Sequence, residues 1–210
     1  MNRFKHLGPI RATLVALLLA TSAVAEDEHA AHRAQALAKQ NFLVSERSYA
    51  LPPVTLVDQT GAPVPIEQLR TGAERTIVSF IFTSCAGICP MITANVARAL
   101  PELDRIDEDY QVVLITVDPE FDTPERLAEY AGRFGTGDDV RFLTGRSEDV
   151  FRVLRDLDAL YEGDNKMNHQ PVTLISNTAP SGWHRIDGLI GADTLVQQYR
   201  AVIERERRAG

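Results

Sequence analysis

The 210-residue sequence contains only two cysteines, Cys85 and Cys89, and both lie in one short segment. A framework of several disulfides is therefore excluded. A single bridge between these residues would close a loop of a few residues, and so short a loop removes little entropy from the unfolded chain. The pair is better explained by chemistry than by a structural role, with two small buried hydrophobic side chains as the alternative.

The sequence also lacks an excess of basic residues, an internal repeat and a glycine-rich phosphate loop. It contains 22 Lys and Arg residues against 29 Asp and Glu residues, for a formal net charge of −7. An acidic protein repels polyanions, which argues against nucleic acid or an anionic membrane surface as a partner. We expect a protein client, with membrane contact only through an uncleaved leader or a membrane-bound client.

Long apolar runs are absent after the N-terminal region. There, Arg3, Lys5 and Arg11 precede an uncharged run, 12–25, that ends in small residues and is followed by Glu26. This order is typical of a secretory signal peptide cleaved before Glu26. The alternative is an uncleaved anchor facing the periplasm, although a spanning helix needs about 20 apolar residues. Cleavage removes three of the 22 basic residues and none of the 29 acidic ones, which leaves a charge of −10 on a periplasmic or otherwise exported protein.

The sequence predicts three parts: a signal peptide over 1–25, a flexible segment over 26–48, and a single domain over 49–210. The middle segment is rich in Ala, Gln and charged residues, and we interpret it as a tether or loose helix. It contains His29 and His32, which are three residues apart and would share a helical face. Whether they bind a metal stays open.

Strand and helix patterns alternate through the domain. Strands are expected at 54–57, 76–82, 112–117, 141–143, 172–175 and 183–186. Helices are expected at 90–103, 123–134, 147–157 and 193–207, with Thr123, Ser147 and Asp193 as caps. This alternation predicts a largely parallel sheet with helices on its faces, ending in an antiparallel edge hairpin.

The cysteine segment follows the most apolar strand, 76–82, and leads into a helix. Backbone N–H groups at the start of a helix stabilise negative charge, so thiol pKa values fall there. If the turn is helical, Cys85 and Cys89 lie on one face and both sulfurs can point at a common third group. A cysteine pair where a buried strand of a mixed sheet meets a helix predicts a thioredoxin-like α/β fold, a three-layer sandwich.

His169 is the best candidate for a third ligand. It precedes the strand at 172–175 and can reach the sheet edge where the cysteine turn lies. Two thiolates and one imidazole form a soft set that suits Cu(I), and the imidazole also allows Cu(II). A structural zinc site would need a fourth ligand. The competing histidine, His184, lies in an expected edge strand and better fits packing or a surface role.

Three patterns together carry a family resemblance: the T-x-C-x-x-x-C-P run at 83–90, the acidic segment at 118–124, and His169. With these the sequence resembles the Sco/SenC family, thioredoxin-like copper-binding assembly factors of cytochrome c oxidase, over nearly all of 51–200. The resemblance implies that Cys85, Cys89 and His169 bind copper. It also implies that an acidic residue, Asp118, lies near the site.

The sequence departs from the family pattern at three positions. Ala86 stands where Pro is usual, Phe121 where Arg is usual, and Asn168 where Asp is usual. These departures indicate a divergent branch of the family. Pro171, just before a strand, occupies a position similar to that of the cis-proline of thioredoxins.

Three functions are compatible with these residues. The first is a copper chaperone for a respiratory enzyme such as cytochrome c oxidase, with an oxidase subunit as the client. The second is a periplasmic thiol–disulfide oxidoreductase, with Cys85 and Cys89 as a redox-active pair that acts on a partner's cysteines. The third, a peroxidase, is disfavoured because Thr83 lies one residue too close to Cys85 for the P-x-x-x-T-x-x-C pattern of peroxiredoxins.

The leader hypothesis makes a direct prediction. Exported protein should begin at Glu26, because the small residues of the cleavage site lie directly before the change to charged residues. Intact-mass measurement of the exported protein checks this. A full-length mass in the membrane fraction would instead support the anchor.

Overall fold

The computed structural model describes residues 42–70, 75–107, 109–160, 163 and 165–209. The expected leader and both N-terminal histidines lie outside the described residues. The strands are β1 (Leu43–Ser48), β2 (Thr55–Asp58), β3 (Pro63–Pro65), β4 (Arg75–Ile81), β5 (Tyr110–Thr116), β6 (Val140–Thr144), β7 (Val172–Ser176) and β8 (Gly182–Asp187). The helices are α2 (Ile88–Ile106), α3 (Pro124–Gly132), α4 (Ser147–Asp156) and α5 (Ala192–Ala209), with 3-10 turns η1 (Ile66–Arg70) and η2 (Lys166–Asn168).

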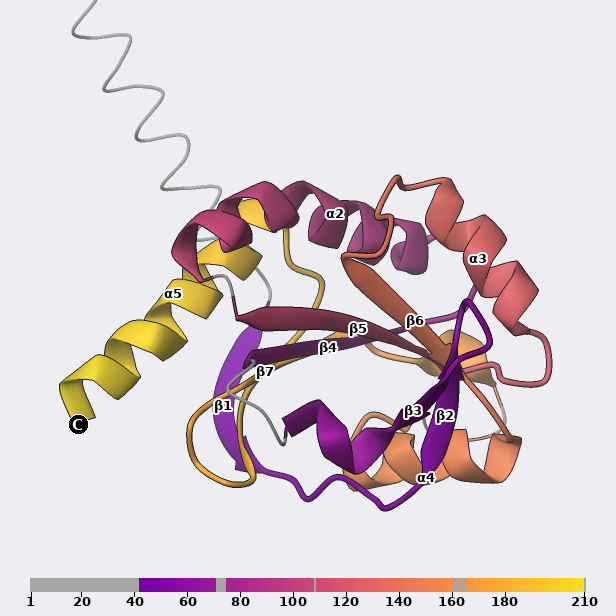
Figure 1. The fold of residues 1–210 in the computed structure, drawn as a ribbon, viewed down its shortest axis with the longest axis horizontal. Helices are drawn as coiled ribbons and strands as arrows, with labels where there is room; N and C mark the ends of the chain where they lie inside the picture. Colours follow the sequence, from indigo (N-terminus) through magenta and orange to yellow (C-terminus); the bar gives the residue numbers. More distant parts are fainter. Residues whose placement is uncertain (1–41, 71–74, 108, 161–162, 164, 210) are drawn as a thin grey trace, which may run out of the picture. The chain divides into compact units, whose positions relative to one another are not determined.

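The described strands form one sheet in the order β1-β8-β7-β4-β5-β6-β2-β3. Strands β4, β5 and β6 run parallel, and the remaining neighbours are antiparallel. Right-handed crossovers place α2 and α3 on the same face of the parallel strands. Figure 1 shows α2 and α3 above the sheet and α4 below it. The prediction of a mixed sheet between helical layers is confirmed.

Strand β4 lies in the middle of this sheet because its sequence is apolar on both faces. Ile77, Val78, Phe80 and Ile81 are all fully buried. Burial of each such side chain contributes about 2 kcal/mol, so a shift of β4 relative to its neighbours would be costly. The end of β4 therefore has a fixed position, which also fixes where the following loop, the one that contains Cys85, begins.

Strand directions bring three chain segments to the same edge of the sheet. Parallel pairing of β4 with β5, up to Ile81 beside Thr116, puts the loops after both strands next to each other. Strand β7 runs antiparallel to β4, with Thr173 beside Ser79, so the residues before β7 lie at that same edge. The cysteines, the acidic segment 118–122 and His169 belong to these three segments.

Two expectations for the N-terminal side and the last hairpin were wrong. Residues 43–48 form β1, not a tether or loose helix, and pair with β8, where Val44 lies beside Ile186. Most of β1 is exposed, so its backbone pairing leaves little apolar pattern in the sequence. The hairpin of β7 and β8 is antiparallel as expected, but β1 covers β8, so β8 is not an edge strand.

Smaller differences concern helix starts and one proline. Thr123 caps α3 as expected and accepts a hydrogen bond from the Arg126 N–H. The cap of α4 is Arg146 instead of Ser147, and α5 already begins at Ala192. The described residues contain no cis peptide bond, so the expected similarity of Pro171 to a cis-proline does not hold. No helix in the described ranges has both the length and the apolar character needed to span a membrane.

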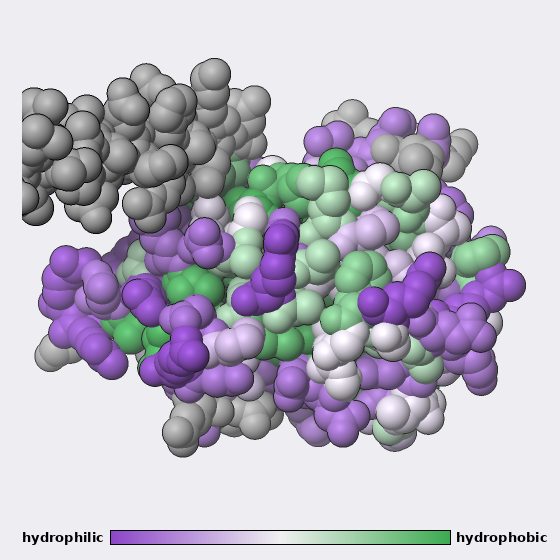
Figure 2. Space-filling model, turned by 90° about the horizontal axis from the view of Figure 1, so that it is seen from above, coloured by the Kyte–Doolittle hydropathy of each residue, from purple (hydrophilic) through white to green (hydrophobic). Residues whose placement is uncertain are grey.

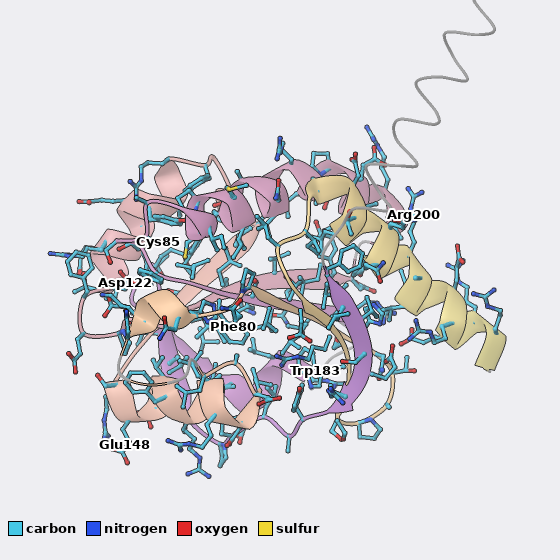
Figure 3. The ribbon with its side chains drawn as sticks, turned by 180° about the vertical axis from the view of Figure 1, so that it is seen from behind. Phe80, Cys85, Asp122, Glu148, Trp183 and Arg200 are labelled. Carbon is cyan, nitrogen blue, oxygen red and sulfur yellow. The ribbon has the colours of Figure 1, made fainter. Side chains whose placement is uncertain are left out.

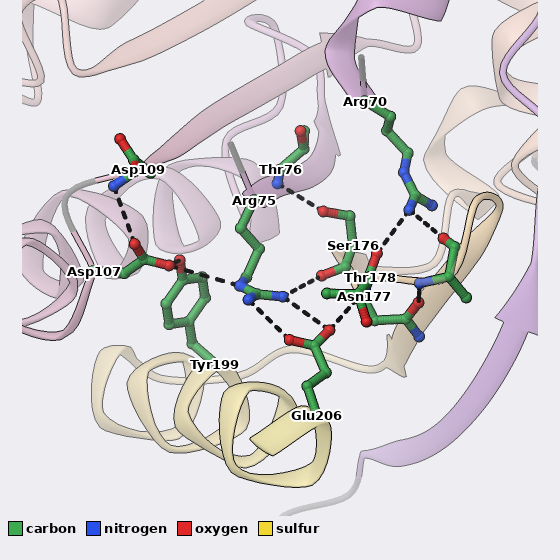
Figure 4. Close-up of polar contacts among 11 residues, drawn as sticks. Arg70, Arg75, Thr76, Asp107, Asp109, Ser176, Asn177, Thr178, Tyr199 and Glu206 are labelled. Carbon is green, nitrogen blue, oxygen red and sulfur yellow. Dashed lines mark hydrogen bonds and ion pairs between the residues drawn. The ribbon is translucent and has the colours of Figure 1, made fainter. Parts of the chain in front are cut away.

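At the other end of β4, Arg75 ties the sheet to α5 (Figure 4). Its guanidinium forms two hydrogen bonds with the carboxylate of Glu206, at 2.9 and 3.1 Å, and another with the Ser176 carbonyl. Glu206 also accepts from the Thr178 N–H, at 2.7 Å. Because both charged side chains are largely buried, each depends on the other for compensation.

We predict that Arg75→Ala lowers the free energy of unfolding by about 3 kcal/mol, because it leaves the Glu206 carboxylate without its partner. The matched control is Arg152→Ala, which removes an exposed pair with Asp156 and should cost less than about 0.5 kcal/mol. Urea denaturation measures both. Equal costs for the two substitutions would contradict the prediction.

Candidate functional site

The loop at 82–87 connects β4 to α2 and presents Cys85 at the start of the helix. The N-cap of α2, Gly87, makes no side-chain capping hydrogen bond. Instead, the backbone N–H groups of Gly87, Ile88 and Cys89 donate to the sulfur of Cys85. N–H groups at the start of a helix have no acceptor within the helix. The Cys85 sulfur therefore takes the place of a capping side chain.

The two thiols differ in acidity. Burial raises the pKa of Cys85, but hydrogen bonds from the helix N–H groups and from the Cys89 thiol outweigh it, so the pKa lies below its usual value. Burial raises the pKa of Cys89 to about 12, and negative charge on Cys85 and Asp122 adds to the effect. Both cysteines are free, and Cys85 is 9% exposed whereas Cys89 is 1% exposed. Cys85 is therefore the reactive thiol of the pair.

The sulfurs meet for a different reason than the sequence suggested. Residues 83–87 form a turn and a bend, and α2 begins only at Ile88. Cys85 and Cys89 thus do not share the face of one continuous helix. They meet at the start of α2, where the Cys85 sulfur accepts hydrogen bonds from N–H groups there and from the Cys89 thiol.

A buried carboxylate, that of Asp122, holds this loop in place. The side chain is fully buried and accepts hydrogen bonds from the N–H and hydroxyl of Thr83 and from the hydroxyl of Thr116. Figure 3 shows Asp122 near Cys85, at the same end of the sheet. Asp122 therefore fixes the loop after β4 to the loop after β5.

Asp118, the acidic residue expected near the site, pairs with Lys166. The side chain of Asp118 is 14% exposed and that of Lys166 is 35% exposed, so the ion pair is partly shielded from water. Lys166 begins η2, which leads to His169. Neither Lys166 nor Asp122 was predicted individually as a functional residue. The acidic segment at 118–124 included Asp122 and so pointed to it, whereas nothing in the sequence distinguishes one lysine in a polar loop.

His169 lies at the expected edge and is buried, 8% exposed. Its ring packs edge-on against Phe80, with centroids 6.2 Å apart, and forms a hydrogen bond with the Phe80 backbone. Burial lowers the pKa of His169, so the imidazole is neutral at pH 7. Among the described residues, its buried Nε2 atom has no hydrogen-bond partner. An oriented, neutral ring with one unpartnered nitrogen is the arrangement that metal-binding histidines commonly have.

The structure brings the two cysteines together but does not complete a three-ligand set. Within the described ranges, no three His, Cys, Asp or Glu side chains are close enough to hold a metal ion. His184 is not a competitor for His169. It is 1% exposed, and its ring nitrogens lie 2.7 Å from Glu46 Oε1 and 2.8 Å from Gln198 Oε1. Of the two roles expected for His184, packing or surface, the burial of the side chain fits packing.

Exposed apolar side chains border the cysteine loop. Ile88 and Met91, in the first turn of α2, are 38% and 52% exposed, and Phe121 is 42% exposed. Figure 2 shows apolar residues interspersed with hydrophilic ones on the face that α2 and α3 cover. Solvent-accessible apolar side chains are therefore present in the same part of the fold as Cys85.

Comparison with known proteins identifies the family. Residues 45–204 match the SCO1/SenC family. The chain belongs to this family. Among its relatives, a Stutzerimonas stutzeri protein named for copper binding is 33% identical over 172 residues, 78% of this chain and 80% of that protein. The SCO1 protein homolog of Bacillus subtilis is 32% identical over 129 residues, 59% of this chain and 66% of that protein.

Solved structures of SCO1/SenC proteins share the fold. BsSco, described as a cytochrome c oxidase assembly protein with a disulfide switch, has a TM-score of 0.61 and 26% identity, over 75% of this chain and 95% of that one. Copper-bound ScoI of Arabidopsis thaliana has a TM-score of 0.56 and 25% identity, over 72% of this chain and 99% of that one. The predicted family and the thioredoxin-like fold are confirmed.

The difference in pKa between the thiols predicts their order of modification. In reduced protein at pH 8, iodoacetamide should label Cys85 roughly tenfold or more faster than Cys89, because the thiolate is the nucleophile. Mass spectrometry of the labelled peptides measures both rates. In Cys85→Ser, Cys89 should stay slow until strongly alkaline pH. Equal rates in the wild-type protein would show that the N–H groups of α2 do not stabilise the Cys85 thiolate.

Proposed function

We propose that this protein binds copper through Cys85, Cys89 and His169 and takes part in the assembly of a respiratory enzyme such as cytochrome c oxidase. The observation that carries the proposal is the buried Nε2 of His169, to which the described part of the chain supplies no hydrogen-bond partner. A buried acceptor without a partner is costly in a folded protein. A metal ion at this atom would supply the missing interaction.

The donor chemistry supports copper as the metal. Two thiolates and one imidazole favour Cu(I), and the imidazole extends the set to Cu(II). The lowered pKa of Cys85 favours the thiolate that a metal needs, whereas Cys89 must lose its proton when the metal binds. Because metal competes with this proton, binding should strengthen as the pH rises.

The separation of the ligands has a consequence for binding. Because the cysteines and His169 are not gathered in the described structure, the two segments must approach each other when the ion binds. Such an approach is compatible with a carrier, which must release its metal as well as hold it.

The copper-binding relatives and the SCO1/SenC match support a client of the cytochrome oxidase type. We propose that the protein is exported and that the client contacts the apolar residues beside Cys85. Ile88, Met91 and Phe121 provide this contact surface. The copper ion is then the cargo that passes to the client's own ligands.

A second function, thiol–disulfide exchange, is favoured by the unequal thiols. The Cys85 thiolate would attack a client disulfide and form a mixed disulfide, and a client thiolate would leave. Cys89, after losing its proton, would attack Cys85, form the intramolecular disulfide and release the second client thiolate. The client is reduced by two electrons and this protein is oxidised by two. The same sulfurs would serve both functions, so oxidation and copper binding exclude each other.

We predict that reduced protein binds Cu(I) and that the disulfide form does not, because the lone pairs of the thiolates are the ligands. His169→Ala should keep the disulfide chemistry but lose the thiolate-to-Cu(II) absorption. It should also weaken copper retention by about 100-fold or more, since loss of an outer partner of a ligand alone costs 10–100-fold. Spectroscopic titration measures both effects.

The matched control is Gln170→Ala, an exposed neighbour of His169 in the same loop, which should change neither the spectrum nor the affinity. An intact Cu(II) spectrum in His169→Ala would contradict the three-ligand proposal and place thiol–disulfide exchange first. Equal affinity of oxidised and reduced protein would contradict the role of the cysteines.

A further inference from the structure

The ammonium group of Lys166 contacts both loops on the cysteine side of the site. It forms an ion pair with Asp118, in the loop that follows β5. It also lies 5.5 Å from the ring centroid of Phe82, the first residue after β4, and 5.8 Å from that of Phe121. A cation at these distances from aromatic faces is attracted by both rings.

Lys166 is also tied to the backbone of His169. The His169 N–H donates a hydrogen bond to the Lys166 carbonyl, at 3.1 Å, which closes the η2 turn. The same lysine therefore contacts the cysteine side through its side chain and His169 through its main chain. A change in the position of Lys166 must change the position of His169 or break this hydrogen bond.

The loop that receives Lys166 is itself firmly held. The Asp118 N–H donates to Thr116 Oγ1 at 2.9 Å, and the Asp122 N–H donates to the Asp118 carbonyl at 2.9 Å. Asp122 in turn holds Thr83 and with it the cysteine loop. A continuous set of contacts thus leads from the Cys85 loop through Asp122, Asp118 and Lys166 to His169.

We propose that Lys166 is a positioning residue for copper binding. Its contacts with Asp118, Phe82 and Phe121 hold the η2 turn, and with it His169, at the same edge of the sheet as the cysteine loop. From there the ring can complete the ligand set when the ion draws the two segments together. This inference rests on the proposed copper function. It adds that the third ligand is positioned by a cation that does not touch the metal.

The test is Lys166→Met in the full chain, which keeps the apolar stem and removes the ammonium. We expect copper retention to weaken about tenfold, as is typical for loss of an outer partner of a metal ligand, with the iodoacetamide rate of Cys85 unchanged. In metal-free protein, modification of His169 by diethylpyrocarbonate should become several-fold faster, because the buried ring becomes accessible. A merely structural role in the cysteine loop would change the Cys85 rate instead.

The matched control is Arg126→Met. The Arg126 guanidinium lies 3.8 Å from the Phe121 ring centroid, so it is a second cation on one of the same rings, but it lies on α3 instead of η2. It should leave both the His169 modification rate and copper retention unchanged. Lys166→Arg, which keeps the cation, should restore most of both properties.

Asp118→Asn tests the same ion pair by changing its acidic partner. It should reproduce the effects of Lys166→Met, and Lys166→Met should add little on the Asp118→Asn background, because the two act through one ion pair. Unchanged His169 modification and unchanged copper retention in Lys166→Met would overturn the inference. If wild-type protein itself fails to bind copper, the proposed function fails, and the metal-free modification rates still decide whether Lys166 positions His169.

Discussion

The geometry of the site depends on the hydrogen bonds of one buried carboxylate, that of Asp122. A fully buried carboxylate is unstable without donors. Asp122 obtains them from Thr83, in the loop after β4, and from Thr116, the last residue of β5. These donors stabilise the buried carboxylate, and the carboxylate in turn holds the loop after β4 against the end of β5. Its position also disfavours a second negative charge nearby, which contributes to the high pKa of Cys89.

Cys85 and Cys89 are chemically different although they are four residues apart. One sulfur lies at the positive end of a helix and accepts its N–H groups, whereas the other is buried beside a carboxylate. The pair therefore combines a thiol with a lowered pKa, which loses its proton more easily than an ordinary cysteine, with a thiol that keeps its proton. Either a metal ion or a client disulfide meets the same thiolate first, which explains how one pair can support both proposed functions.

The fold could be predicted from the sequence wherever burial produced a periodic pattern. The apolar strands β4, β5 and β7 and the helices between them lie within a few residues of their expected bounds. Strand β1 could not be predicted, because an exposed strand held by backbone pairing has no apolar pattern. The cysteine pair and His169 could be recognised as candidate ligands from their residue types and their order along the chain. Lys166 was not recognised, because its role arises from contacts between segments that are distant in sequence, and Asp122 was included only as part of the acidic segment at 118–124.

The use of Cys85 as the cap of α2 couples the helix to the chemistry of the sulfur. The helix N–H groups interact with a negatively charged sulfur more strongly than with a neutral one. Any event that removes charge from the sulfur, such as protonation or disulfide formation, must therefore loosen the first turn of α2. By thermodynamic linkage the reverse also holds, so a partner that distorts this turn changes the affinity of the sulfur for whatever it binds. At the start of α2, the free energy of docking a partner and the free energy of releasing the group bound to the sulfur are therefore coupled.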